Sequence, residues 1–214
     1  ITCRDWSSDV CSSDLSCVVL DVGANPDVKP ENLYQFAILG SIYAEKVRGV
    51  KNPKVGLVSN GEEEGKGNHN VKEATPLLKG AGLNFVGNVE GKEVIGGGVD
   101  VAVIDGFAGN IMLKTAEAVA KLMGDKIKEM IKSGGPLAML GGILVKPALG
   151  KIKKLLDPSE EGAAPLLGVN GLVFIGHGRS DENAITNAIR VAKNAAEAKV
   201  VEAMRDGIRE RLPR

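Results

Sequence analysis

The chain has 214 residues and a formal net charge of zero, because 27 basic side chains balance 27 acidic ones. Aromatic residues make up only 3% of it. This composition argues against nucleic-acid binding, which needs a basic surface and aromatic stacking platforms. Glycine is abundant, with 28 residues where average usage gives roughly fifteen, as is typical of an α/β protein with many tight turns. The length predicts one domain or a large part of one.

The first 16 residues differ in composition from the rest. The stretch DWSSDVCSSDL (residues 5–15) has neither a helical nor a strand period, and it lacks the basic and apolar regions of a secretory signal. It resembles one reading frame of a short-read sequencing adaptor. We therefore expect residues 1–16 to be a non-native, disordered leader; a divergent natural N-terminus is the alternative. Beyond the leader Cys17 is the only thiol, which excludes a disulfide framework and fits a reducing cytoplasm.

From residue 17 onward, apolar runs alternate with helical patterns. Strands are expected at residues 17–21, 54–59, 83–88, 99–105 and 171–178. Helices are expected from Pro30, around Pro76, from near Asn110, and from a cap at Ser180 to about Arg209. Continuous apolar strands that alternate with helices predict a three-layer α/β fold with a mostly parallel sheet.

Four polar loops directly follow expected strands, and ligands of such folds bind beyond the carboxyl ends of the strands. The loops are residues 21–25, 61–68, 105–110 and 176–178. The loop GEEEGKGN is not a nucleotide P-loop, because Gly61 and Gly65 are too close and Gly67 stands at the Ser/Thr position. The sequence also contains no metal-ligand spacing and no nucleophile elbow.

Five residues in these loops are candidates for chemistry. Lys66, between two glycines, is either a flexible cation for an anion or oxyanion, or a solvated loop lysine. Asn110 is expected to open a helix whose first amides favour anions, or to be a simple cap. His177 is either a general base or donor, or structural. Asp21 and Asp105 are expected to tie loops to backbone amides. These residues indicate an α/β enzyme that acts on an anionic ligand.

The segment 126–156 is both basic and apolar. Between Lys126 and Lys154 seven lysines accompany one acid, Glu129, so the net charge is +6. Pro136 and Pro147 are expected to divide the segment into two helical pieces. Such an amphipathic hairpin either lies on an anionic bilayer or packs against a partner subunit, and both readings stay open.

Four motifs follow one another along the chain: LDVGANPDVKPENLYQFAILGSIYAEKVRGVKNPKVGLVSNGEEEGKGN, GNVEGKEV, DVAVIDGFAGNIMLKTAEA and GAAPLLGVNGLVFIGHGRSDENAITNAI. Together they resemble the bacterial phosphate acyltransferase family, PlsX, from about Val18 to about Arg205. The resemblance covers only the C-terminal three fifths of the family chain, so the N-terminal part with its DAMGGD opening is expected to be missing. Whether the fragment is active is therefore a separate question.

The resemblance implies a fold like that of isopropylmalate dehydrogenase and phosphotransacetylase. It also implies transfer of a fatty acyl group from acyl carrier protein to inorganic phosphate, with no cofactor or metal. The family is a homodimer in the cytoplasm, at the inner face of the cell membrane, where it supplies acyl phosphate to a membrane glycerol-3-phosphate acyltransferase. Nucleic acid is not an expected partner.

The family motifs assign roles by position. Lys66 and Asn110 fall on catalytic residues. The substrate pocket is assigned to Asn25, Gly61, Gly67, Asn68, Gly109 and His177. The membrane-contacting arm is assigned to Leu137, Leu140, Leu144, Lys146 and Lys151. Two alternatives remain: a phosphotransacetylase-like enzyme that uses coenzyme A, and an inactive fragment that only self-associates or adheres to membranes.

Overall fold

The computed structural model describes residues 17–155, 158–178 and 180–211, and only the backbone of residues 151–155 and 158. The expected leader, residues 1–16, lies outside the described residues. The elements in chain order are β1 (Val18–Leu20), α1 (Pro30–Lys46), β2 (Lys54–Val58), α2 (His69–Lys79), β3 (Asn84–Val89), α3 (Gly91–Gly96), β4 (Val101–Val103), α4 (Gly106–Ser133), α5 (Gly135–Leu155), η1 (Pro158–Glu160), β5 (Ala163–Pro165), β6 (Phe174–Gly176), α6 (Glu182–Glu197) and α7 (Val200–Arg211).

The main sheet has four parallel strands in the order β1-β4-β2-β3, which confirms the predicted parallel α/β architecture. Val101 of β4 pairs with Val18 on one side and with Val55 on the other, so β4 lies in the middle of the sheet. β5 and β6 form a separate antiparallel pair. The last expected strand is therefore present, but it does not belong to the parallel sheet.

Helices cover both faces of the main sheet. Successive strand residues point to opposite sides, so Val18 joins a large core with α1, α2 and α7, whereas Val19 joins a smaller core with α3 and the base of α4. Helix α1 lies so close that a Cβ on its Gly40 would be 2.6 Å from Cγ1 of Val101. The result is three layers with the sheet in the middle.

Several helix boundaries differ from the sequence-based expectation. Helix α4 begins at Gly106 with Asp105 as its N-cap, so Asn110 lies in its second turn and the expectation that it opens the helix was wrong. The final helix is capped by Asp181 instead of Ser180. It is also two helices, α6 and α7, separated where Lys199 adopts a positive φ of 50°. Helix α3 and strand β5 were not expected.

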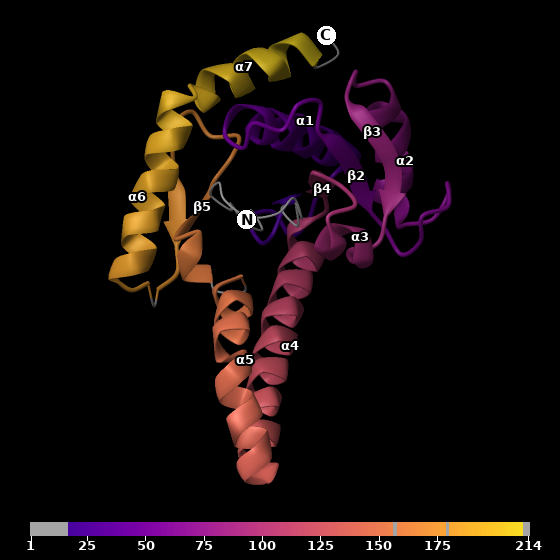
Figure 1. Ribbon diagram of the computed structural model, residues 1–214. Helices are drawn as coiled ribbons and strands as arrows, with labels where there is room; N and C mark the ends of the chain where they lie inside the picture. Colours follow the sequence, from indigo (N-terminus) through magenta and orange to yellow (C-terminus); the bar gives the residue numbers. More distant parts are fainter. Residues whose placement is uncertain (1–16, 156–157, 179, 212–214) are drawn as a thin grey trace.

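The long helices α4 and α5 form an antiparallel hairpin that projects from the α/β body (Figure 1). The turn lies at Gly134 and Gly135, where Gly135 has a φ of 80°. Pro136 is in the first turn of α5, where a missing N–H costs nothing. Pro147 lies inside α5 and does not end it, so the expected second break was wrong. The helices approach closely, since a Cβ on Gly142 would be 2.4 Å from Cγ2 of Ile131.

Candidate active site at the carboxyl edge of the sheet

The loops after the parallel strands open on one edge of the sheet. Residues 21–25 follow β1, residues 59–68 follow β2, and residues 104–105 connect β4 to α4. Because β4 lies between β1 and β2, its loop is flanked by the other two. Three of the four loops singled out in the sequence therefore share the edge where ligands of such folds bind.

The buried carboxylate of Asp21 organises the first loop. Its oxygens accept hydrogen bonds from the amides of Gly23 (2.9 Å), Ala24 (2.9 Å) and Asn25 (2.6 Å), and from Nδ2 of Asn25 (2.8 Å). Burial alone would raise the pKa of Asp21, but these hydrogen bonds outweigh it and hold the pKa below its usual value. The prediction that Asp21 ties its loop to backbone amides is confirmed.

The first loop packs directly on the start of α4. The carbonyl oxygen of Asn25 accepts a hydrogen bond from the Gly106 amide at 2.9 Å. A Cβ on Gly109 would lie 1.9 Å from the carbonyl oxygen of Asp21, so only glycine allows this approach. A Cβ on Gly23 would lie 3.6 Å from Nδ2 of Asn110. The structure thus brings together Asn25, Gly109 and Asn110.

The first amides of α4 have little capacity left for an anion. The Ala108 amide donates to Oδ1 of Asp105 at 2.8 Å, and the Gly106 amide donates to Asn25. The expected anion site made from helix amides at Asn110 is therefore mostly occupied by protein acceptors. Asn110 is itself exposed, so its side-chain amide is open to an external acceptor.

The second loop carries Lys66 between two glycines with positive φ, 96° at Gly65 and 97° at Gly67. The Lys66 amide donates to the carbonyl of Glu63 at 3.1 Å, and the Gly67 amide donates to Oδ1 of Asn60 at 2.9 Å. The Lys66 side chain is exposed and makes no ion pair with any residue that the structure describes. A fixed backbone therefore presents a free ammonium group.

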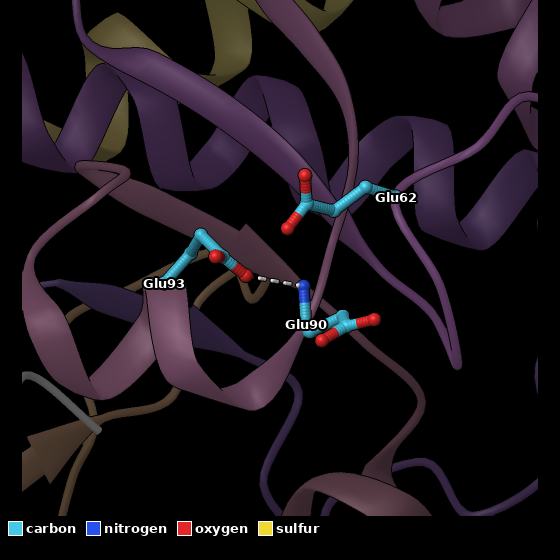
Figure 2. A group of neighbouring side chains, drawn as sticks. All are labelled: Glu62, Glu90 and Glu93. Atoms are coloured by element: carbon cyan, nitrogen blue, oxygen red, sulfur yellow. Dashed lines mark hydrogen bonds between the residues drawn. The ribbon is translucent and has the colours of Figure 1, made fainter.

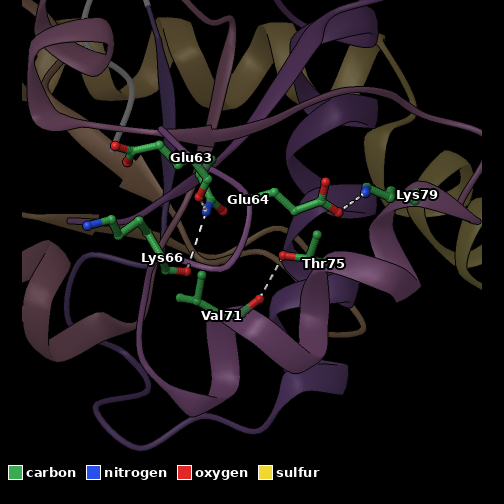
Figure 3. Close-up of polar contacts among 7 residues, drawn as sticks. Glu63, Glu64, Lys66, Val71, Thr75 and Lys79 are labelled. Atoms are coloured by element: carbon green, nitrogen blue, oxygen red, sulfur yellow. Dashed lines mark hydrogen bonds and ion pairs between the residues drawn. The ribbon is translucent and has the colours of Figure 1, made fainter. Parts of the chain in front are cut away.

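The neighbouring glutamates are largely engaged by other lysines. Glu64 pairs with Lys79, and Figure 3 shows the Lys66 side chain extending away from that pair. Glu62 lies 2.7 Å from Nζ of Lys92. The expectation that the three glutamates form an exposed face is confirmed, but two of them are neutralised by ion pairs. They consequently leave Lys66 available to an external anion.

Three carboxylates gather around Lys92, one from the loop after β2 and two from the start of α3. Glu62, Glu90 and Glu93 lie together (Figure 2), with oxygens 2.7, 3.3 and 3.5 Å from Nζ of Lys92. Hydrogen bonds to Glu62 and Glu90 raise the pKa of Lys92 above its usual value. The ammonium of Lys92 is thus the cation that pairs with these three carboxylates. Sequence reasoning missed the cluster because Glu62 is in the loop after β2, far along the chain from Glu90 and Glu93 at the start of α3, a helix that was not expected.

The remaining predicted pocket residues have varied surroundings. A Cβ on the buried Gly61 would lie 2.9 Å from Cγ of Lys66, so glycine leaves room for that side chain. A Cβ on Gly67 would lie 2.4 Å from Cγ1 of Val71. Asn68 caps α2 by accepting the Val71 amide at 3.0 Å. His177 follows β6 of the two-stranded sheet, and its carbonyl accepts two hydrogen bonds from Ser180.

One further side chain reaches the Lys66 loop. Nδ2 of Asn88, on β3, lies 3.1 Å from the carbonyl oxygen of Glu63 and 3.4 Å from that of Lys66. Sequence reasoning did not select Asn88, because its proximity depends on the pairing of β3 with β2. The loop after β2 carries the Lys66 ammonium, and the start of α4 carries the Asn110 side-chain amide. Together they can place a cation and an amide donor at one edge of the sheet, which is suited to binding an anion.

The chain is similar in sequence to known proteins. Residues 10–203 match a family model described as "Fatty acid synthesis protein". A protein of Elusimicrobium minutum named phosphate acyltransferase is 51% identical over 193 residues, 90% of this chain and 56% of that protein. Proteins with the same name are 52% identical in Desulfitobacterium hafniense (92% of this chain, 58% of that protein) and 53% in Aquifex aeolicus (82% and 52%). The chain spans little more than half the length of these curated relatives.

Proposed function

The chain belongs to the fatty acid synthesis protein family, and on that premise we propose that it is an acyltransferase acting on phosphate. The substrates would be inorganic phosphate and the fatty acyl thioester of acyl carrier protein. The name of its relatives, phosphate acyltransferase, supports this class of reaction. The product, an acyl phosphate, would enter phospholipid synthesis.

The reaction is a direct acyl transfer. A phosphate oxygen attacks the carbonyl carbon of the thioester, a C–O bond forms, and the carbonyl oxygen becomes an oxyanion. Collapse of this tetrahedral species breaks the C–S bond, and the proton lost from hydrogen phosphate ends on the carrier thiol. Holding two substrates together and stabilising their charge is sufficient for this chemistry, so no cofactor or metal is required.

Lys66 and Asn110 are the residues that we assign to this step. The observation that carries the assignment is the exposed ammonium of Lys66, which has no ion-pair partner among the described residues, on a loop at the same sheet edge as Asn110. The ammonium would neutralise phosphate and the developing oxyanion, while the Asn110 side chain would donate a hydrogen bond to the same charge.

The surrounding loops would form the pocket. Asn25 accepts the Gly106 amide at the start of α4, Gly109 packs on the Asp21 carbonyl, and Gly61 and Gly67 shape the Lys66 loop. Asn68 would contribute through α2, whose start it caps. We also assign His177 to the pocket wall, on the strength of its family-like motif alone.

The α4–α5 hairpin is proposed to lie on the anionic inner face of the cell membrane. Leu137 is 82% exposed, Leu140 56% and Leu144 74%, and Lys146 is exposed beside them. The side chain of Lys151, the other assigned arm lysine, is outside the described residues. No helix in the described part of the chain has the length and apolar character to cross a bilayer. Surface binding would deliver acyl phosphate to a membrane glycerol-3-phosphate acyltransferase.

The hairpin also offers apolar side chains to a second copy of the chain. Leu122, Met123 and Met130 of α4 are exposed as well as the leucines of α5. A homodimer through part of this surface would bury side chains that the single chain leaves in water.

The reaction is tested by incubating the 214-residue chain with acyl carrier protein thioester and following the free thiol with and without inorganic phosphate. Phosphate-dependent thiol release with matching acyl phosphate supports the proposal. Release from acyl coenzyme A instead would indicate the phosphotransacetylase-like alternative. Release from neither thioester would mean that this chain alone is a fragment without the activity.

The membrane proposal is tested with Leu140→Glu and a matched control, Ile185→Glu, on a body helix at similar exposure (52%). Leu140→Glu should weaken binding to phosphatidylglycerol vesicles by about tenfold or more, since it removes an exposed leucine that the bilayer would bury and adds a negative charge. Ile185→Glu should bind like the parent. Equal binding of Leu140→Glu and the parent would exclude this surface as the contact.

A further inference from the structure

We propose that Asn88 is a positioning residue that fixes the Lys66 loop from the neighbouring strand. The inference rests on the proposed function only in giving Lys66 a catalytic task. Its structural part, that Asn88 holds the loop, stands on contacts within the chain.

Asn88 connects the loop after β2 to strand β3. In the parallel register Asn88 lies beside Leu57, close to the point where β2 ends and the loop begins. Its two amide hydrogens face the carbonyl oxygens of Glu63 (3.1 Å) and Lys66 (3.4 Å). The next residue, Val89, accepts the Ser59 amide at 2.8 Å. The end of β3 therefore holds both the start of the loop and its tip.

The loop requires such an attachment because its own sequence makes it flexible. Gly65 and Gly67, on either side of Lys66, have access to more backbone conformations than any other residue type. The turn is closed by the Lys66 amide on the Glu63 carbonyl, and these are the residues whose carbonyls Asn88 binds. One side chain thus bridges both ends of the turn that carries the ammonium.

The chemistry of the contact selects an amide side chain. Both acceptors are carbonyl oxygens, so the tether must be a donor with two hydrogens. Oδ1 of Asn88 is buried and has no hydrogen-bond partner among the described residues. Leaving a buried acceptor without a partner costs free energy. Asn88 bears this cost in the side-chain orientation that directs both Nδ2 hydrogens to the carbonyl oxygens of the loop. Aspartate has the same shape but would bring a carboxylate against two carbonyls.

The tether is tested by hydrogen exchange at the Lys66 and Gly67 amides, measured by NMR. Asn88→Ala should accelerate exchange at these amides by about tenfold, the effect expected for the loss of one or two hydrogen bonds. Asn88→Asp should accelerate it further. The matched control is Asn84→Ala, on the same strand, because Nδ2 of Asn84 donates to the Asn52 carbonyl (3.0 Å) at the opposite end of β3.

Asn84→Ala should leave the Lys66 and Gly67 amides unchanged. Unchanged exchange in Asn88→Ala, or equal acceleration in both variants, would overturn the proposal. This result does not depend on turnover, so it is separate from the fate of the proposed function.

The link to catalysis is tested by a double-mutant cycle on phosphate-dependent thiol release. If Asn88 acts through Lys66, Asn88→Ala should lower kcat about tenfold in the parent and have no further effect in Lys66→Met, since residues that act as a unit are not additive. Additive losses would overturn the positioning role. A Lys66→Met variant with the parent's rate would instead contradict the proposed function.

Discussion

The α/β body and the helical hairpin use their apolar residues in opposite ways. In the body, Val55, Leu57, Val101 and Val103 are fully buried between two helical layers. In the hairpin, the only buried residues among the described side chains are Gly106 and Gly109, at its base. Apolar side chains in the body stabilise the fold, whereas those of the hairpin remain available to a surface outside the chain.

The largest expected difference is in the free energy of unfolding, between the effects of replacing a leucine of the body and a leucine of the hairpin. Leu57→Ala should lower the free energy of unfolding by about 3 kcal/mol, because it leaves a cavity in the core. Leu144→Ala on the hairpin should change it by less than about 0.5 kcal/mol. Urea denaturation of both variants measures the contrast. Equal losses would show that the hairpin leucine is part of the stabilising core.

A pair of glycines in the same helix sharpens the comparison. Gly109→Ala should destabilise by about 2 kcal/mol, because the added Cβ would meet the Asp21 carbonyl oxygen in the body. At Gly124, in the hairpin, a Cβ meets nothing within 4 Å. Gly124→Ala should therefore stabilise by up to about 1 kcal/mol, the usual gain of alanine in a helix. Thermal unfolding of the two variants measures both changes in stability. A Gly109→Ala variant more stable than the parent would contradict the packing of α4 on the first loop.

The smallest expected effect depends on pH and belongs to the body alone. The folded-state pKa of Asp21 is lowered, so its contribution to stability is present above the unfolded-state pKa of about 3.9 and is lost as pH falls through the folded value. Asp21→Asn should cost about 1 to 2 kcal/mol at pH 7 and flatten the acid limb of the stability curve. Asp27→Asn, at an exposed site nearby, serves as the control. An unchanged acid limb in Asp21→Asn would refute the assignment.

Elements that depend on local signals could be predicted from the sequence, whereas a boundary that depends on a contact between the hairpin and the body could not. The strands and α1 follow from apolar runs and from Pro30 at the helix start, which are local signals. The start of α4 was misplaced because Gly106 and Gly109 resemble loop residues. Their presence in a helix is explained by its contact with the first loop, a tertiary effect that overrides propensity.

A residue of the candidate site could be predicted only where its side-chain chemistry and its place directly after an expected strand both pointed to a function. Lys66 was identifiable as a cation between glycines after a strand, and the structure places its loop at the sheet edge that was predicted. The role of Asn88 depends on the register of β3 against β2, which is not encoded locally. His177 was expected to share the edge of the main sheet because its strand looked like the others. That strand pairs with β5 instead.

The central claim is that the Lys66 ammonium stabilises the charge formed during acyl transfer to phosphate. The most direct measurement is kcat/KM for phosphate-dependent thiol release in Lys66→Met, compared with Lys72→Met at an exposed position on α2. We predict a loss of about 100-fold or more for Lys66→Met, as for removal of one charge-stabilising group, and a parent-like rate for Lys72→Met. Equal rates in the parent and in Lys66→Met would contradict the account.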